Sequence, residues 1–376
     1  MRLLIIAGGH PIASRDPLAG IFEWEQAIAL KKQGLDVTYF SIDLRSLRRQ
    51  RKLGYSSGVN DGVEWHVISL PIGNVKKKLL CKIGQIAAKW LYNRVYSHRE
   101  VPDLLHAHFG IVANYAISIK KQTNIPFFIT EHSSGMNSVV TNKDEVQVAK
   151  AAYSYADKVF AVSEALSASI KELTGIDSEV VYNMVKTDVF SQCNPKAHKE
   201  FRITTISNLI PLKNTICLIK AFEALFKQYT LFRLEIIGDG ELRDELEQYV
   251  RRCGISDAVN FHGRLNSNEI LSILEISDCM AMVSKTETFG VVYVEAMAAG
   301  LPVIATRCGG PERIVNDNNG ILVKVNDEEE LKKAIIYLYN HKNHYHSDEI
   351  RKYAVENFSE GAIAKKLIEK YNEFLK

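Results

Sequence analysis

The sequence contains no uninterrupted apolar run approaching the roughly 18 residues that a membrane-spanning helix requires. Its six cysteines are scattered, no two form a C-x-x-C pair, and a chain of 376 residues is too large to need a disulfide framework. Low-complexity tracts are also missing, while 46% of the residues are hydrophobic and 24% are charged. These absences exclude a disordered, collagen-like or membrane-spanning protein and predict a folded chain with reduced thiols in the cytoplasm.

The chain is long enough for two domains, since about 150 residues per domain is a reasonable prior. Short apolar runs alternate with helical patterns nearly throughout, and a polar segment containing Pro195 interrupts them. We therefore expect an N-terminal domain over 1–190, a linker over 191–200 and a C-terminal domain over 201–357. A C-terminal helix is expected over 358–376, and it can cross back to the N-terminal domain.

Strands that alternate with helices of this length favour right-handed β-α-β units and a parallel sheet. The expected strands, such as RLLIIA (2–7) and RITTISN (202–208), are nearly continuous apolar runs, as in a sheet that helices cover on both faces. The predicted fold class is therefore α/β, with two doubly wound, Rossmann-like parallel-sheet domains. Ligands of such sheets bind beyond the carboxyl ends of the strands, and the cleft between two such domains is the expected site.

One segment, residues 283–312, combines several features of a binding site. A strand is followed by a polar loop with Glu287 and then by a helix from about Gly290. Backbone N–H groups over 289–292 would lie at the start of that helix, where they suit a phosphate. Glu287 before the helix and Glu295 inside it would accept hydrogen bonds from hydroxyls at two ends of one ligand. On spacing alone, a loop acid and a solvated helix residue remain the simpler interpretation.

This segment resembles the E-x7-E element of retaining GT-B glycosyltransferases, and the whole chain resembles glycosyltransferase family 4. The resemblance runs through ETFGVVYVE, EAMAAGLPVIAT and GGPERIV, where residue types of the family fall in register. It implies the GT-B fold, with two facing domains and a cleft between them, and it implies that Glu287 contacts hydroxyls of the donor sugar and Glu295 those of the ribose. It also implies that the backbone of four residues approaches the sugar and the diphosphate, namely Phe289, Gly290, Val291 and Val292.

Further landmarks of the family follow in the C-terminal half. SNLIPLKN (207–214) occupies the place of a segment whose Arg and Lys hold the donor diphosphate. Lys213 matches the Lys, but Asn208 stands where Arg is usual, and asparagine donates only a neutral hydrogen bond, so one positive charge is missing. VNFHGRL (259–265) resembles the strand and turn near the nucleotide base, which puts Arg264 among the donor-binding residues.

In the N-terminal half, the resemblance assigns His132 of TEHSS to the anomeric centre of the sugar, where it hydrogen-bonds by side chain or backbone. Gly20 matches a glycine that starts the first helix close to the diphosphate, although no G-x-G-x-x-G fingerprint of a dinucleotide site is present. His106 and His108 share one face of a strand, which can indicate a metal site, but no cysteine or carboxylate cluster completes a ligand set. We interpret His108 as part of the cleft wall and expect no metal and no cofactor.

The net charge of +3 hides one strongly basic segment, because residues 45–99 carry twelve Lys or Arg and two acids, a net +10. A helix expected over 77–98 has apolar residues at helical spacing among its basic ones; they are Leu79, Leu80, Ile83, Ile86, Ala87, Trp90, Leu91 and Val95. A helix packed on the sheet with a solvated basic face explains the apolar residues but not the scarcity of acids. We expect instead an anionic membrane surface as the partner, at the inner face of the cell membrane, and no nucleic acid, because no nucleic-acid-binding motif accompanies the charge.

The predicted function is a retaining glycosyltransferase that moves a sugar from a UDP- or GDP-sugar to a hydroxyl of a glycan or lipid-linked acceptor, in bacterial surface polysaccharide synthesis. Its predicted catalytic residues are His132, Glu287 and Lys213. Two other functions stay open: a nucleotide-sugar epimerase of similar fold, which needs no acceptor, and a non-catalytic binding homologue, which Asn208 would motivate. Turnover of the donor and a requirement for an acceptor separate the three.

Overall fold

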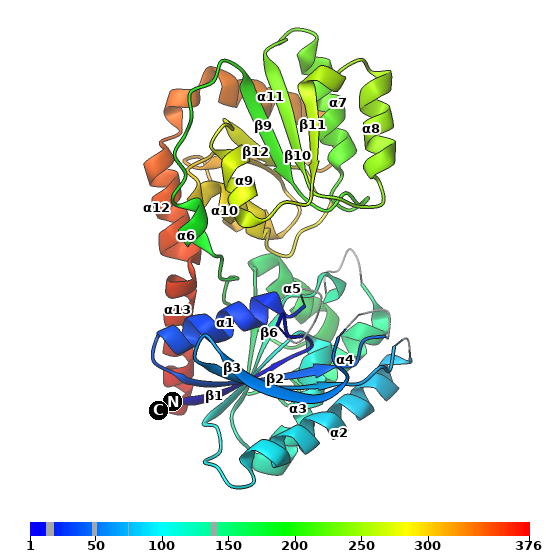
Figure 1. The fold of residues 1–376 in the computed structure, drawn as a ribbon, viewed down its shortest axis with the longest axis vertical. Helices are drawn as coiled ribbons and strands as arrows, with labels where there is room; N and C mark the ends of the chain where they lie inside the picture. Colours follow the sequence, from blue (N-terminus) through cyan, green and yellow to red (C-terminus); the bar gives the residue numbers. More distant parts are fainter. Residues whose placement is uncertain (13–18, 47–50, 74, 137–140) are drawn as a thin grey trace. The chain divides into compact units, whose positions relative to one another are not determined.

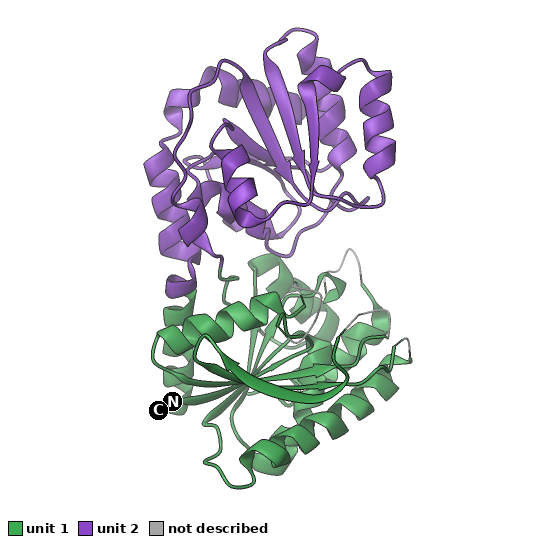
Figure 2. Cartoon of the chain, in the orientation of Figure 1, with its two compact units in different colours: residues 1–184, 363–376 green, residues 185–362 purple. Residues whose placement is uncertain are grey.

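The structure is a computed structural model that describes all residues except 13–18, 47–50, 74 and 137–140, so Arg48 and Arg49 of the basic segment lie outside the described residues. The chain forms two compact units, which Figure 2 draws in different colours. Unit 1 is Met1–Met184 together with Ile363–Lys376, and unit 2 is Val185–Ala362. Each unit is built on one sheet with helices packed against it, as Figure 1 shows with its element labels.

The sheet of unit 1 has the strand order β3-β4-β2-β1-β5-β6-β7-β8. β1 pairs in parallel with β2 on one side and β5 on the other, so the chain order reverses beside β1 and creates a switch point at the carboxyl ends of β1 and β5. The strands are β1 (Arg2–Ala7), β2 (Asp36–Asp43), β3 (Gly54–Asn60), β4 (Val63–Ser69), β5 (Leu104–His108), β6 (Phe127–Glu131), β7 (Lys158–Ala161) and β8 (Glu179–Val180).

The edge strand β3 corrects the expectation of a purely parallel sheet, because it pairs antiparallel with β4. Its sequence, GYSSGVN, is polar and largely exposed, so it lacks the apolar run that predicted the other strands. The turn between the two strands holds Asp61 at φ 51° and Gly62 at φ 75°, the left-handed conformations of a tight hairpin turn. This Asp-Gly pair was the available signal for the hairpin.

The helices of unit 1 cover both faces of its sheet (Figure 1), and α5 has ordinary caps at both of its ends. α5 begins where Ser163 Oγ accepts a hydrogen bond from the Leu166 N–H at 3.2 Å, and it ends at Gly175, whose φ is 78°. The helices are α1 (Ile21–Lys32), α2 (Lys77–Tyr96), α3 (Gly110–Thr123), α4 (Lys143–Tyr153), α5 (Glu164–Thr174) and the last helix, α13 (Glu360–Leu375). Residues 363–376 belong to unit 1, where Ile363, Leu367 and Tyr371 lie in its hydrophobic core with Leu3 and Ile5.

The sheet of unit 2 is parallel, in the order β11-β10-β9-β12-β13-β14. β9 lies between β10 and β12, so a second switch point lies at the carboxyl ends of β9 and β12. The strands are β9 (Phe201–Ile206), β10 (Phe232–Ile237), β11 (Val259–Gly263), β12 (Cys279–Met282), β13 (Val303–Thr306) and β14 (Gly320–Val323).

The two units divide between Met184 and Val185, so residues 191–200, expected as a linker, lie within unit 2. Phe190 and Cys193 are buried, and the Lys196 N–H donates to the Glu275 carbonyl oxygen at 2.7 Å, which ties this segment to unit 2. The helices of unit 2 are α6 (Thr187–Phe190), α7 (Thr215–Phe226), α8 (Arg243–Arg252), α9 (Ser267–Leu274), α10 (Val291–Ala298), α11 (Glu328–Asn340) and α12 (Ser347–Phe358).

Candidate functional site

Lys213 and Glu287, which are far apart in the sequence, meet at the switch point of unit 2. Lys213 follows β9 and Glu287 follows β12, and the Lys213 Nζ forms an ion pair with the Glu287 Oε1. The same Oε1 accepts a hydrogen bond from Ser284 Oγ at 3.0 Å. The Glu287 side chain is only 10% exposed, so its carboxylate has a fixed position and a fixed set of partners.

Backbone hydrogen bonds hold the loop of Glu287 from both sides. The Lys285 N–H donates to the Leu212 carbonyl at 2.8 Å, which joins this loop to the segment before Lys213. On the other side, the Glu287 N–H donates to the Cys308 carbonyl at 3.2 Å, and the Gly310 N–H donates to the Glu287 carbonyl at 2.9 Å. Because the anchoring is by backbone groups, the loop does not depend on the Glu287 carboxylate for its shape.

The start of α10 lies directly after this loop. Gly290 precedes the helix at φ 96°, a left-handed conformation that favours glycine. The first N–H groups of a helix have no partner within it, so those of Val291 and Val292 are suited to an anion. Phe289 contributes backbone only, because its side chain is buried and packs against Phe358 with ring centroids 5.8 Å apart. Glu295 lies half-buried inside the helix.

Asn208 and Arg264 are both exposed and follow β9 and β11 at the same edge of the sheet. Between them lies the turn after β10, where the Gly238 N–H donates to the Gly263 carbonyl at 2.7 Å. A Cβ on Gly238, whose φ is 130°, would lie 1.8 Å from the Ser207 carbonyl oxygen, so only glycine permits this close approach. The predicted residues of unit 2 therefore lie on adjacent strand ends along one edge.

Gly20 lies at the start of α1 in unit 1, at φ 72°. A Cβ at this position would lie 2.4 Å from the Gly9 carbonyl oxygen, so the turn after β1 and the start of α1 approach each other backbone to backbone. The Tyr39 hydroxyl donates to the Gly9 carbonyl oxygen at 2.8 Å and fixes this approach.

His132 directly follows β6 and is half-buried. Its Nε2 lies 2.9 Å from His108 Nδ1, and its Nδ1 lies 2.8 Å from Asn183 Oδ1. Removal from water lowers the pKa of His132 to about 4, which keeps the ring neutral near pH 7. Asn183 was missed from the sequence, where a single amide in a loop gives no signal.

Glu131 is a second residue that the sequence reasoning missed. It is fully buried, and its Oε1 accepts from the N–H groups of His132 at 2.9 Å and Ser133 at 2.8 Å. Its Oε2 accepts from the Gly110 N–H at 2.8 Å and the Tyr153 hydroxyl at 2.5 Å. Burial raises the pKa of this carboxyl, and these four donors oppose that shift. The buried acid therefore shapes the turn that presents His132.

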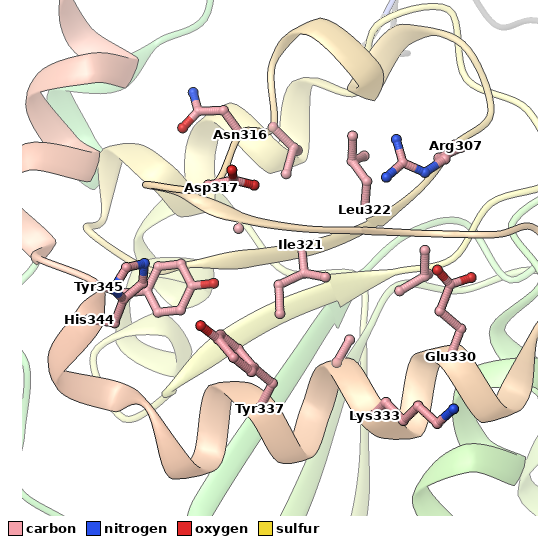
Figure 3. Close-up of a pocket in the computed structure, with 14 residues that line it drawn as sticks. Arg307, Asn316, Asp317, Ile321, Leu322, Glu330, Lys333, Tyr337, His344 and Tyr345 are labelled. Carbon is pink, nitrogen blue, oxygen red and sulfur yellow. The ribbon is translucent and has the colours of Figure 1, made fainter.

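A cavity of about 550 Å³ lies elsewhere in unit 2, beside β14 and α11, as Figure 3 shows. No predicted site residue lines it. Arg307, which follows β13, contributes to its wall, together with Glu330, Lys333, Tyr337 and Tyr345. Within the described part of the chain, no group of three or more His, Cys, Asp or Glu side chains is arranged to hold a metal ion.

A further surface feature concerns α2. Its buried face consists of Cys81, Gly84, Ala87, Ala88, Leu91, Tyr92 and Val95. Leu79, Ile86 and Trp90 are instead exposed, by 50%, 71% and 44% of their surface. The apolar residues that the sequence suggested as one stripe therefore divide into a packed face and an exposed one.

Two family models match the chain, one in each half. The model described as Glycosyltransferase Family 4 matches residues 22–189, and the model described as Glycosyl transferases group 1 matches residues 187–357. TuaC of Bacillus subtilis, which is named as a glycosyltransferase of teichuronic acid biosynthesis, is 25% identical over 402 aligned residues, covering 100% of this chain and 99% of that protein.

Solved structures share the fold across nearly the whole chain. Sucrose-phosphate synthase from Thermosynechococcus elongatus aligns with a TM-score of 0.79 at 19% identity, covering 99% of this chain and 98% of the other. Alr3699/HepE of Anabaena, solved in complex with UDP-glucose, aligns with a TM-score of 0.72 at 19% identity, covering 99% of both chains. This likeness confirms the predicted GT-B fold class.

Proposed function

The chain is a glycosyltransferase of the group 1 and family 4 type, and on that basis we propose that it is a retaining enzyme that transfers a sugar from a nucleotide diphosphate sugar to an acceptor hydroxyl. The acceptor would be a glycan or a lipid-linked glycan in the synthesis of a bacterial surface polysaccharide. The name of the full-length relative TuaC supports that class of acceptor, and the UDP-glucose complex of Alr3699/HepE supports the class of donor.

The proposal assigns the donor site to the carboxyl edge of the unit 2 sheet. Lys213, Arg264 and the N–H groups at the start of α10 supply positive charge and donors for the diphosphate. Glu287 and Glu295 supply carboxylate oxygens for sugar and ribose hydroxyls. The observation that supports this most directly is the ion pair of Lys213 with Glu287. In the proposal, Lys213 would be the cation for the diphosphate and Glu287 the hydrogen-bond acceptor for the sugar.

The anomeric configuration would be retained because the diphosphate leaves from, and the acceptor oxygen attacks, the same face of the sugar. The bond from the anomeric carbon to the diphosphate oxygen breaks, and its electron pair leaves with the diphosphate. The acceptor oxygen bonds to the anomeric carbon from that side, while its proton passes to the departing phosphate oxygen. Lys213 and the start of α10 would stabilise the charge that develops there, and the proposal includes no metal and no cofactor.

A panel of UDP- and GDP-sugars tests this function, first by thermal stabilisation and then by turnover in the presence of EDTA. A donor at 100 times its Kd adds about 2.7 kcal/mol to the stability, which a melting curve detects. We expect one donor to be consumed only when a glycan acceptor is present, with the anomeric configuration retained. Conversion of the donor without an acceptor would identify an epimerase, and stabilisation without any turnover would identify a binding homologue.

Replacing Asn208 by arginine should tighten the binding of the nucleoside diphosphate. The position is exposed, so the larger side chain is tolerated, and a guanidinium would add a charged hydrogen bond to the diphosphate. We expect Kd for UDP or GDP, measured by calorimetry, to fall about tenfold, since hydrogen bonds to charged groups contribute roughly 1.5–3 kcal/mol. Asn208→Leu is the uncharged control; weaker binding in Asn208→Arg would show that this position does not face the diphosphate.

We extend the proposal to an anionic membrane surface, which α2 would contact. Leu79, Ile86 and Trp90 recur at helical spacing on its exposed side, and the exposed Lys82 and Lys89 lie among them in the sequence. An apolar strip between lysines suits the interface between lipid headgroups and acyl chains. Among the described helices, none is long and apolar enough to cross a bilayer.

Charge reversal at the start of α2 should weaken membrane binding. Each Lys or Arg near an anionic bilayer contributes about 1 kcal/mol, and salt screens this attraction. We expect the protein to sediment with anionic vesicles at low salt and to be released at high salt. Lys76, Lys77 and Lys78 changed to Glu should lower the bound fraction and leave transfer to a soluble acceptor unchanged.

The matched control makes the same charge change on the exposed Lys365, Lys366 and Lys376, which lie in α13 and at its end. That variant should sediment like the original protein. Equal sedimentation with neutral and anionic vesicles, or equal loss in both triple variants, would contradict a membrane-binding α2.

A further inference from the structure

Three histidines form a stacked ladder at the switch point of unit 1. The rings of His106 and His108 have centroids 4.7 Å apart, and those of His108 and His132 have centroids 5.2 Å apart, with interplanar angles of 18° and 22°. His106 and His108 are buried, on β5, while His132 follows the neighbouring strand β6. The sequence resemblance gives a role to His132 alone, so the role of the other two rings is open.

Hydrogen bonds connect the ladder at its outer end. Asn183 Oδ1 lies 2.8 Å from His132 Nδ1, and His132 Nε2 lies 2.9 Å from His108 Nδ1. The amide nitrogen of the buried Gln26 then donates to His108 Nε2 at 3.2 Å. With the amides oriented this way, His132 and His108 both carry their proton on Nδ1, and each Nε2 accepts.

The inner end of the ladder reaches the last helix of the chain. The hydroxyl of Tyr371, on α13, lies 2.6 Å from His106 Nδ1, and His106 Nε2 lies 2.7 Å from Thr130 Oγ1. Gln26 Nε2 also lies 3.4 Å from His106 Nδ1, so this amide joins the inner ring to His108. Tyr371 is fully buried, so its hydroxyl is committed to this contact.

This arrangement holds together only while the rings are neutral. A second proton on His132 would sit on Nε2 and face the Nδ1–H of His108, so two donors would meet with no acceptor between them. Both ring nitrogens of His132 are already occupied, by His108 and Asn183, and neither has a hydrogen bond left for a ligand. The ring of His132 is therefore held in place from two sides rather than free to donate.

We propose that His108 and Asn183 are positioning residues that fix the ring of His132 as a neutral Nδ1–H tautomer, and that Tyr371 is the inner anchor of this ladder. The inference rests on the proposed function, together with the contact between the His132 segment and the transferred sugar that the sequence resemblance implies. In this inference the backbone of the segment makes the contact, because both ring nitrogens of His132 are already bonded to His108 and Asn183. The network moves no proton during transfer; it keeps one loop conformation.

Two substitutions at His108 separate hydrogen bonding from packing. His108→Asn keeps an amide group close to the place of Nδ1, while His108→Phe keeps the ring and the stack but removes the hydrogen bond. We expect His108→Phe to lower kcat about tenfold, because a small displacement of a binding loop is enough for such a loss, and His108→Asn to stay within about threefold. KM for the donor should change less than kcat. Equal activities of the two variants would overturn the positioning role.

Tyr371→Phe tests the inner anchor, with Tyr92→Phe as the matched control. Tyr92 is buried in the same unit, and its hydroxyl has no hydrogen-bond partner among the described residues, so its removal should leave kcat unchanged. We expect Tyr371→Phe to lower kcat about threefold, as the loss of one buried hydrogen bond allows. Equal kcat in the two variants would show that the Tyr371 hydroxyl does not help to position His132.

Nitrogen-15 NMR of the histidine rings reports their tautomers and protonation states without any substrate. We expect His132 and His108 to appear as neutral Nδ1–H tautomers near pH 6, where an ordinary histidine with a pKa of about 6.5 is mostly protonated. An Nε2–H tautomer or a protonated ring would overturn the inference even in an active enzyme. Absence of turnover by the unaltered protein, with the predicted tautomers present, would instead count against the proposed function alone.

Discussion

Replacing Glu287 by alanine is expected to lower kcat/KM by about 10²–10³-fold, the loss typical for removal of one preorganised polar group from an active site. The carboxylate would accept hydrogen bonds from the sugar as the bond to the diphosphate breaks, and it also holds the Lys213 ammonium in place. The substitution removes both effects. The loop should keep its shape because its anchors are the backbone bonds to Cys308 and Gly310.

Thermal unfolding and calorimetry with UDP or GDP separate chemistry from folding in this variant. We expect the melting temperature to change little and the nucleotide still to bind, since Lys213 and the start of α10 remain. Glu245→Ala, at an exposed position of α8, is the control and should keep full activity. A folded Glu287→Ala protein that transfers sugar at the original rate would refute the assignment of this loop to the donor.

Acidification below pH 6.5 is expected to destabilise unit 1 through its buried histidines. Burial lowers the pKa of His106 to about 3 and that of His132 to about 4, and it also lowers the pKa of His108. His10, buried among aromatic rings, has its pKa lowered to about 4 for the same reason. In the unfolded chain each of these rings takes up a proton near its ordinary pKa of 6.5.

The sign follows from which state binds protons. Between pH 6.5 and 4 the unfolded state is protonated at these rings and the native state is not, so the free energy of unfolding falls as the pH falls. Each ring should remove about 1.4 kcal/mol per pH unit in this window. Urea unfolding at several pH values measures the slope, and His108→Asn should make it shallower by one ring. The buried Glu23, whose pKa burial raises to about 7, contributes a slope of the opposite sign. A slope that His108→Asn leaves unchanged would therefore contradict neutral burial of the ladder.

The alternation of strands and helices was predictable because most inner strands are apolar runs that helical patterns separate. β3 escaped prediction for the opposite reason, since an exposed edge strand has no apolar run and its hairpin signal is two residues long. The division between Met184 and Val185 could not be predicted from the sequence, because the burial of Phe190 within unit 2 depends on contacts with residues that are distant in the sequence.

The candidate site likewise contains residues that the sequence predicted and residues that it did not. The resemblance to family motifs identified Glu287 and Lys213 as site residues. Because a parallel sheet brings the loops after adjacent strands to one edge, their proximity follows from the topology. Glu131, Asn183 and Tyr371 were not identified in this way. Each is a single polar residue whose role depends on contacts made only in the folded chain, and the contact of Tyr371 with His106 spans 265 residues of sequence.

Because Ile363–Lys376 complete the core of unit 1, the order of synthesis on the ribosome matters for this chain. Unit 2 is one continuous stretch and can fold as soon as residue 362 has emerged, as domains generally fold while synthesis proceeds. Unit 1, although its first residues are made early, needs residues 363–376 before Tyr371 can contact His106. A chain whose synthesis stops before residue 363 would therefore contain a folded unit 2 and a unit 1 with an incomplete hydrophobic core. Such an incompletely folded unit is a target for chaperones and proteases.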